Sequence, residues 1–225
     1  MTETEIRQKL ETIIEIVRST DHAYQLARYL NTGDTSEERR VAHSNSFIRN
    51  ARHAFWYMAV IEACKLFQNK DNQKHNLHKL LNIIGDNRGK AFLRGKITLA
   101  DIQNWRGLLN SQEISDTTAQ LGNLRNRLYA HTDKVPDLFA DENTPYFHDV
   151  DVLLNVAKRI MSGLKSKIDD AHLIFNELGT PGAKNILNIL IEDRKRHIIS
   201  AEEDLIELRR RMYGDKHPSP HNSQE

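Results

Sequence analysis

The chain has 225 residues, of which 39% are hydrophobic and 28% charged, and its formal net charge is +1. This composition is ordinary for a soluble globular protein, and the length is enough to bury a substantial core. The near-zero charge excludes a surface that is basic all over, so any contact with nucleic acid must be local. The single cysteine, Cys64, excludes an internal disulfide and an all-cysteine zinc site, and it favours a reducing cytosol.

Neither a targeting segment nor a membrane segment is visible. The first five residues are acidic and polar, unlike a secretory signal. The longest apolar run, residues 54–61, is far shorter than the ~20 residues needed to cross a bilayer. We therefore expect a cytoplasmic protein with no membrane contact.

The first third of the chain has helical periodicity. Apolar residues from Ile6 to Val17 recur at the spacing of an amphipathic helix, which is predicted to run to about Leu30 and to be closed by residues 31–33. A second predicted helix starts after residues 36–38 and continues past Phe67. Its middle, residues 54–61, is apolar on all sides, which indicates a helix surrounded by others or shared with a second subunit.

Shorter helices follow a polar connection over residues 68–76. One is predicted from Leu77 to about Ile84, ending at Gly85. Thr98 to Asp101 resembles a capping box and opens a helix that extends to Leu109. Ser111 is the predicted N-cap of the next helix, along which apolar residues recur at roughly helical spacing as far as Leu128.

The last part of the chain is loop-like between Pro136 and Pro145 and then helical again. Helices are predicted over about 147–178 and about 183–212, packed together as an appended antiparallel pair. No strand pattern or internal repeat occurs. The sequence therefore predicts a single all-α helical bundle over residues 1–213 with an appended long C-terminal helix, and a disordered tail over residues 214–225.

The eleven histidines do not form a metal-ligand pattern. The chain has no His-Glu-x-x-His and no glutamate followed three residues later by histidine. The nearest groupings are interpreted as surface polar residues: His75 with His78, His148 with Asp149 and Asp151, and Asp169 with His172. Glycine-rich nucleotide cradles and Gly-x-Ser-x-Gly are also absent, and Cys64 is expected to be a buried, inert thiol. Neither a metal nor a cofactor is predicted.

A basic stretch could hold the phosphates of a nucleic acid. It consists of Arg88, Lys90, Arg94 and Lys96, interleaved with two glycines and with Phe92 as a stacking platform. A solvated loop is the competing interpretation. The basic runs at 194–196 and 209–211 are interpreted as solvated helix faces.

The most informative stretch runs from Leu124 to Asp133 and places Arg125, Asn126, Arg127 and His131 within seven residues. His131 falls in the predicted last turns of a helix, where the dipole favours an imidazolium. Arg125 and His131, six residues apart, would lie about 120° apart around an ideal helix. Arg127 and His131, four apart, would share a face. Either a long Arg125 side chain wraps toward His131, or a second chain completes the geometry.

Arg125-Asn126 followed by His131 resembles the R-x(4–6)-H motif of the HEPN superfamily, the higher eukaryotes and prokaryotes nucleotide-binding helical domains. The flanking residues 124–133, together with residues 62–67 and 75–81, resemble its abortive-infection U-type (AbiU2-like) branch. The resemblance covers roughly residues 40–178. The first 35 residues and the last helix are outside it.

The resemblance implies an all-α HEPN domain that forms a homodimer and cleaves RNA without metal, by phosphoryl transfer to the adjacent 2′-hydroxyl. His131 would be the general acid or base, Arg125 would stabilise the transition state, and Asn126 would orient the histidine or a phosphate oxygen. Arg127 and the basic stretch would bind RNA. The implied role is phage defence, as a toxin restrained by infection state or by a cognate antitoxin of the nucleotidyltransferase type.

Two alternatives remain open. One is a non-catalytic HEPN module that binds nucleotides, RNA or a protein. The other is a purely structural helical dimer, in which Arg125 pairs with Asp133 or Asp116 and His131 caps helix carbonyls.

Overall fold

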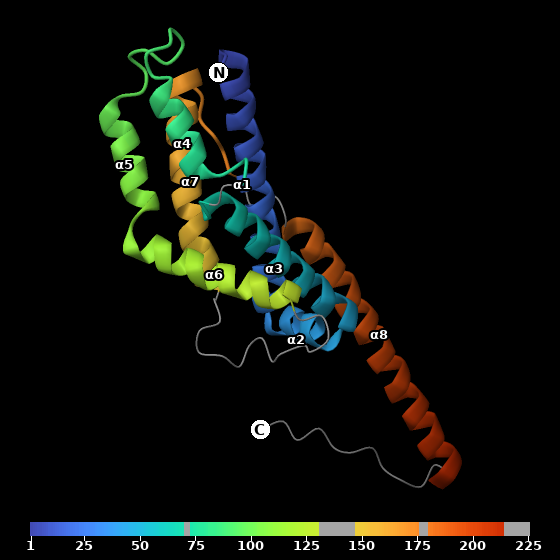
Figure 1. Ribbon diagram of the computed structural model, residues 1–225. Coiled ribbons are helices and arrows are strands. Elements are labelled where there is room, and N and C mark those ends of the chain that lie inside the picture. The colour runs from blue at the N-terminus through green and yellow to red at the C-terminus, as the bar shows by residue number, and fades with distance from the viewer. Residues whose placement is uncertain (70–72, 131–146, 176–179, 214–225) are drawn as a thin grey trace, which may run out of the picture.

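The computed structural model describes residues 1–69, 73–130, 147–175 and 180–213, and of residues 127–130 only the main chain. The described residues form helices and no strand, which confirms the all-α prediction (Figure 1). The helices are α1 (Glu3–Thr32), α2 (Ser36–Ser44), α3 (Ser46–Phe67), α4 (Leu77–Asp86), α5 (Leu99–Leu109), α6 (Gln112–Ala130), α7 (Phe147–Asp169) and α8 (Thr180–Tyr213).

The main core lies between α1, α3 and α7, and is closed by α4, α5 and α6. The apolar face of α1, from Ile6 to Val17, is buried, as its periodicity predicted. Glycine at position 33, with φ of 55°, ends α1 where predicted. Capping boxes open α1, α2 and α5, and the one at Thr98 and Asp101 was visible in the sequence.

The apolar segment 54–61 of α3 is partly covered by other helices of the same chain. α3 packs on α1, α2, α4, α6 and α7. Trp56, Ala59 and Val60 are buried, and the Trp56 ring lies 4.9 Å from that of Phe147 at the start of α7. Met58 is 46% exposed, so one edge of the segment does reach the surface.

The sequence predicted one helix where the structure has α2 and α3. The break falls at Asn45, whose extended backbone (φ −87°, ψ 118°) ends α2. The Asn45 side chain accepts a hydrogen bond from the amide of Ile48 at 3.1 Å and so acts as the N-cap of α3. The missed signal was an asparagine between two serines, a composition that favours caps over helix interiors.

The prediction that α7 continues to Leu178 was also wrong. α7 ends at Asp169, and Asp170 has φ of 53°, a conformation that stops a helix. The chain then runs without helical structure through residues 171–175. Phe175 lies against α7, with the ammonium of Lys158 5.8 Å from its ring centroid, so this segment turns back along the helix that it leaves.

α7 and α8 do not form the appended antiparallel pair that was predicted. α7 is a central core helix, because its apolar face from Val150 to Ile168 is buried against α1, α3, α5 and α6. α8 instead packs on α1 and α2 through Leu187 and Ile191, in a second cluster with Leu30 and Val41. Beyond Ile191, α8 projects away from the bundle (Figure 1).

Candidate functional site

Arg125 and Asn126 lie near the end of α6, where a buried apolar stripe sets their position. Ile114, Leu121 and Leu124 face the core, and Leu124 is the last described side chain of this stripe. Ser111 begins the helix as predicted, with its hydroxyl accepting from the amide of Ile114 at 3.4 Å. Because Leu124 points inward, Arg125 falls at the edge of the core and is half-buried, while Asn126 is exposed.

The guanidinium of Arg125 is held by two amide side chains. Its Nη1 donates to Oε1 of Gln68 at 2.9 Å, and its Nη2 donates to Oδ1 of Asn126 at 3.0 Å. Both acceptors are neutral, and no carboxylate of the described residues pairs with Arg125. The cation therefore keeps its charge and several N–H donors for an anionic ligand.

Gln68 connects this arginine to the end of α3. Its backbone amide closes the last turn of α3 on the carbonyl of Cys64, and its own carbonyl accepts from Asn76 Nδ2 at 3.4 Å. The neighbouring carbonyl of Phe67 accepts a hydrogen bond from the ring of His78. The N-cap and the first turn of α4 thus satisfy carbonyls at the end of α3 that have no partner within that helix.

Gly122 lets α6 approach Gln68 closely. A Cβ at this position would lie 2.5 Å from Nε2 of Gln68, a distance that would force the amide to move. Sequence reasoning missed Gln68, which belonged to a polar connection without pattern. An isolated glycine inside a helix, three residues before Arg125, was the signal that something packs closely there.

The other residues predicted for this site lie beyond the described side chains of α6. His131 lies outside the described residues, as does Asp133, and for Arg127 only the main chain within α6 is described. Asp116, the other carboxylate considered for pairing with Arg125, accepts instead from Gln112 at 2.8 Å. Of the predicted catalytic residues, the structure brings Arg125 and Asn126 together.

The basic stretch, between α4 and α5, lies at the other end of the bundle from the C-terminal end of α6, which carries Arg125 and Asn126 (Figure 1). Its four cations donate to main-chain carbonyls: Arg88 to Gly85 at 3.0 Å, Arg94 to Gly89 at 3.0 Å, Lys96 to Ile168 at 2.6 Å, and Lys90 to Met1. Phe92 packs against the core. One chain therefore does not bring this stretch and the α6 pair into one groove.

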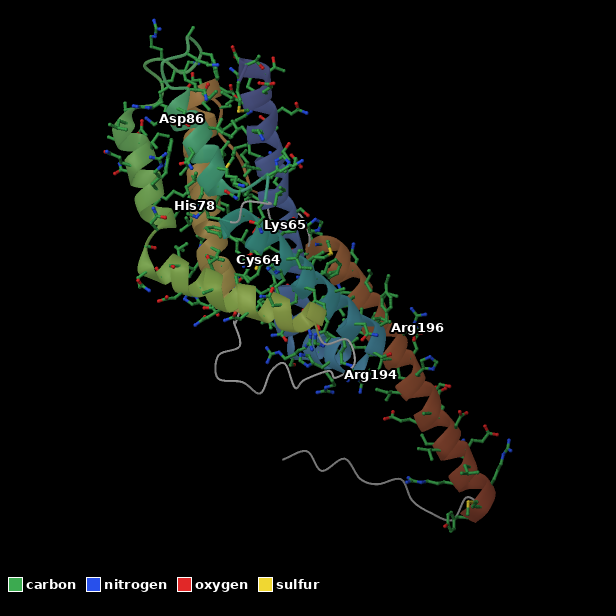
Figure 2. The ribbon with its side chains drawn as sticks, in the orientation of Figure 1. Cys64, Lys65, His78, Asp86, Arg194 and Arg196 are labelled. Atoms are coloured by element: carbon green, nitrogen blue, oxygen red, sulfur yellow. The ribbon has the colours of Figure 1, made fainter. Side chains whose placement is uncertain are left out.

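Two described histidines have lowered pKa values. Figure 2 labels His78 on α4. Burial lowers the pKa of this histidine, although its hydrogen bond to the Phe67 carbonyl acts in the opposite direction. Burial, and then the charges of Arg52 and Arg49, lower the pKa of His53 on α3. Within the described ranges, no three His, Cys, Asp or Glu side chains are grouped so that they could hold a metal ion.

An all-α bundle with adjacent Arg and Asn near the end of a core helix fits the HEPN class of helical domains. The HEPN family described as AbiU2 matches residues 2–187, and the chain belongs to that family. The match includes α1, which the resemblance seen in the sequence did not, and it ends at Leu187 in α8. The family lies within the abortive-infection branch of the HEPN superfamily.

No curated protein and no solved structure significantly matches the chain. None of the described helices is long and apolar enough to span a bilayer.

Proposed function

We propose that this protein is a metal-independent endoribonuclease that acts in abortive infection of phage-infected cells. The observation that carries the proposal is the Arg125 guanidinium, which is fixed by Gln68 and Asn126 and is not neutralised by any described carboxylate. A planar, preorganised cation of this kind suits a phosphate whose negative charge increases during reaction.

The reaction would be an internal transfer at one phosphodiester. The 2′-oxygen attacks the neighbouring phosphorus, its proton passes to a base, and the bond to the 5′-oxygen breaks as that oxygen takes up a proton. The products are a 2′,3′-cyclic phosphate and a 5′-hydroxyl. His131 is our candidate for the proton transfers, because an imidazole titrates near neutral pH. Asn126 would orient the phosphate or the imidazole.

We further propose that the active species is a homodimer. Six residues separate Arg125 from His131, which corresponds to about 120° around a helix, so one helix does not readily place both on one phosphate. A two-fold axis close to the end of α6 would place both copies of Arg125, Asn126 and His131 along one composite groove. Arg127 would add charge to this groove.

The basic stretch is proposed to hold a separate part of the RNA. Arg88, Lys90, Arg94 and Lys96 lie at the other end of the bundle, so within one chain they would contact nucleotides away from the scissile phosphate. Their hydrogen bonds to main-chain carbonyls keep the cations near the surface of that end.

We also propose a protein partner, a cognate antitoxin of the nucleotidyltransferase type, on the basis of the family resemblance.

The test is RNA cleavage by the purified chain in excess EDTA. We expect His131→Ala to lose about 10²- to 10⁴-fold in rate, the usual contribution of a general acid or base. Arg125→Ala should lose activity as well. Arg18→Ala removes an equal charge from an exposed part of α1 and is the matched control. A His131 variant that cleaves as fast as wild type, or a requirement for a divalent ion, would refute the assignment.

The alternative function is a non-catalytic module that binds RNA or nucleotides. The net charge of +1 fits this alternative as well as it fits the nuclease. In that case RNA would bind to wild type and remain intact, and Arg125→Ala would reduce affinity, with Arg18→Ala again as control.

A further inference from the structure

Beyond its base, where Lys195 pairs with Glu37 of α2 at 3.5 Å, the outer part of α8 is covered by none of the other described helices. Every residue from Glu192 to Tyr213 is exposed, which amounts to about six helical turns. Figures 1 and 2 show this part extending away from the bundle, with Arg194 and Arg196 on it. The family match ends at Leu187, so this projection lies outside the matched residues.

An apolar seam runs along the projection. Ile198, Leu205 and Met212 recur every seven residues and are 49%, 54% and 64% exposed. Ala201 and Leu208 fall three residues after the first two, so the pattern is a heptad with apolar a and d positions. The same register begins at Leu187 and Ile191, which are buried against α1 and α2. The seam therefore starts in the core and continues into solvent.

A seam of this kind needs a partner. Most helical stability in proteins comes from the packing of an apolar face, and large exposed apolar side chains favour association. The charges argue against RNA or an anionic membrane, because residues 192–213 carry six acidic and six basic side chains. The acidic ones are 192, 193, 202, 203, 204 and 207, and the basic ones are 194–196 and 209–211.

The residues that flank the seam indicate what the partner is. With Ile198 at a, the g positions are His197 and Asp204, and the following e positions are Glu202 and Arg209. In a parallel pair of identical helices, each g side chain meets the e side chain five residues further along the other helix. His197 would then meet Glu202 and Asp204 would meet Arg209, so both contacts join opposite charges. Neither Asp204 nor Arg209 has an ion pair within the described residues.

We propose that the outer part of α8 pairs with α8 of a second copy of this chain as a parallel, in-register coiled coil. Full antiparallel overlap would place Lys195 against Arg209 and Glu202 against itself. An antiparallel register shifted toward the helix tips joins opposite charges but leaves Ile198 uncovered. The parallel register covers the seam from Ile198 to Met212. Arg194 is a charged residue at a d position of the described part of α8. It lies where α8 leaves the bundle, and its long side chain can extend outward from the seam.

Disulfide cross-linking of the full chain tests this pairing directly. Ile198→Cys places a thiol in the seam, and its two copies would meet in a parallel pair and not in either antiparallel one. The native Cys64 is buried and does not compete. Ser200→Cys, on the opposite side of the helix, is the matched control. We expect mild oxidation to give a covalent dimer of the Ile198 variant alone. No cross-link, or an equal yield from both variants, overturns the proposal.

A charge exchange tests the orientation and the dimer together. In a parallel dimer, Asp204 of each helix meets Arg209 of the other, so the contact occurs twice. Asp204→Arg or Arg209→Asp alone would make both contacts repulsive, and each variant should weaken association by roughly tenfold. The double variant should restore it. In the shifted antiparallel register the double variant would be worse than either single one. A dimer formed only through α6 would be indifferent to all three variants. Either of these last two results overturns the α8 proposal, and neither affects the nuclease proposal.

Discussion

Nη1 of Arg125 donates a hydrogen bond to Oε1 of Gln68 at 2.9 Å, and this bond ties the end of α6 to the end of α3. Gln68 is itself fixed, because its main chain is bonded to Cys64 and Asn76. The conformation of the arginine is therefore set by a residue 57 positions away in the chain. An arginine held in this way loses little conformational freedom when a phosphate binds.

Replacement of Gln68 should reduce activity without unfolding the protein. Gln68→Leu removes the acceptor at similar volume, and we expect RNA cleavage to fall roughly tenfold, because a hydrogen bond to a charged group contributes about 1.5–3 kcal/mol. Gln68→Glu keeps an acceptor but pairs the guanidinium with a carboxylate, so it should reduce cleavage as well. Single-turnover rates check this, with urea unfolding of each variant as control. Equal rates for Gln68→Leu and wild type would show that the bond does not position Arg125.

The sequence predicted the pair of residues in this site but not the residue that supports it. Arg125 and Asn126 are neighbours, so a local motif was enough to find them. Gln68 reaches Arg125 only because α3 and α6 cross, and the crossing is a consequence of packing that no local pattern reports. The same limit applies to the basic stretch: its charge is visible in the sequence, but its place at the other end of the bundle from the C-terminal end of α6 is set by the fold.

Helix faces were predicted better than helix ends and helix partners. Periodicity identified the buried face of α1, and a four-residue motif identified the capping box at Thr98. Both signals are local in the sequence. Asn45 was missed because one capping side chain is enough to split an otherwise continuous helical pattern. The partners of α7 and α8 were missed because an amphipathic face shows that a helix is buried without showing what covers it.

Two glycines in helices should respond to alanine in opposite ways. A Cβ on Gly163 of α7 would lie 2.9 Å from Cζ2 of Trp105, a buried ring that cannot easily shift. We expect Gly163→Ala to destabilise the fold by about 1–3 kcal/mol, the usual cost of overpacking. Gly107 on α5 has nothing within 4 Å of the same atom, so Gly107→Ala should stabilise by up to about 1 kcal/mol. Thermal unfolding measures both, and changes of the same sign would contradict the packing of Trp105 on α7.

The ion pair between Asp21 of α1 and Lys158 of α7 should matter more than those on the surface. Oδ1 of Asp21 lies 2.6 Å from Nζ of Lys158, and the aspartate side chain is 6% exposed. Asp21→Ala leaves the ammonium without its partner in a half-buried position, so we expect a loss of about 2 kcal/mol in the free energy of unfolding. Glu15→Ala breaks an exposed pair with Arg18 and should cost less than about 1 kcal/mol. Urea unfolding compares them, and equal losses would mean that burial adds nothing to the Asp21 pair.

His78 should make the fold sensitive to mild acid. Burial lowers its pKa below the ordinary value of 6.5 in spite of the hydrogen bond to the Phe67 carbonyl. Since the unfolded chain then binds more protons than the folded one, the stabilisation is present above about pH 6.5 and is lost as the pH falls through the folded-state pKa. His78 lies in the first turn of α4, and the partial positive charge at this end of the helix also disfavours the imidazolium.

The variant His78→Gln keeps a polar side chain that can donate to the Phe67 carbonyl but does not titrate in this range. We expect the free energy of unfolding of wild type to decrease more steeply than that of the variant between about pH 7 and about pH 5. Urea unfolding at a series of pH values measures the difference in slope. His53 contributes to the same slope, because burial lowers its pKa too, so His53→Gln should act in the same direction and the double variant should show the flattest profile. If His78→Gln and wild type have parallel profiles, protonation of His78 costs the folded state nothing, and the imidazole is not held neutral at the junction of α3 and α4.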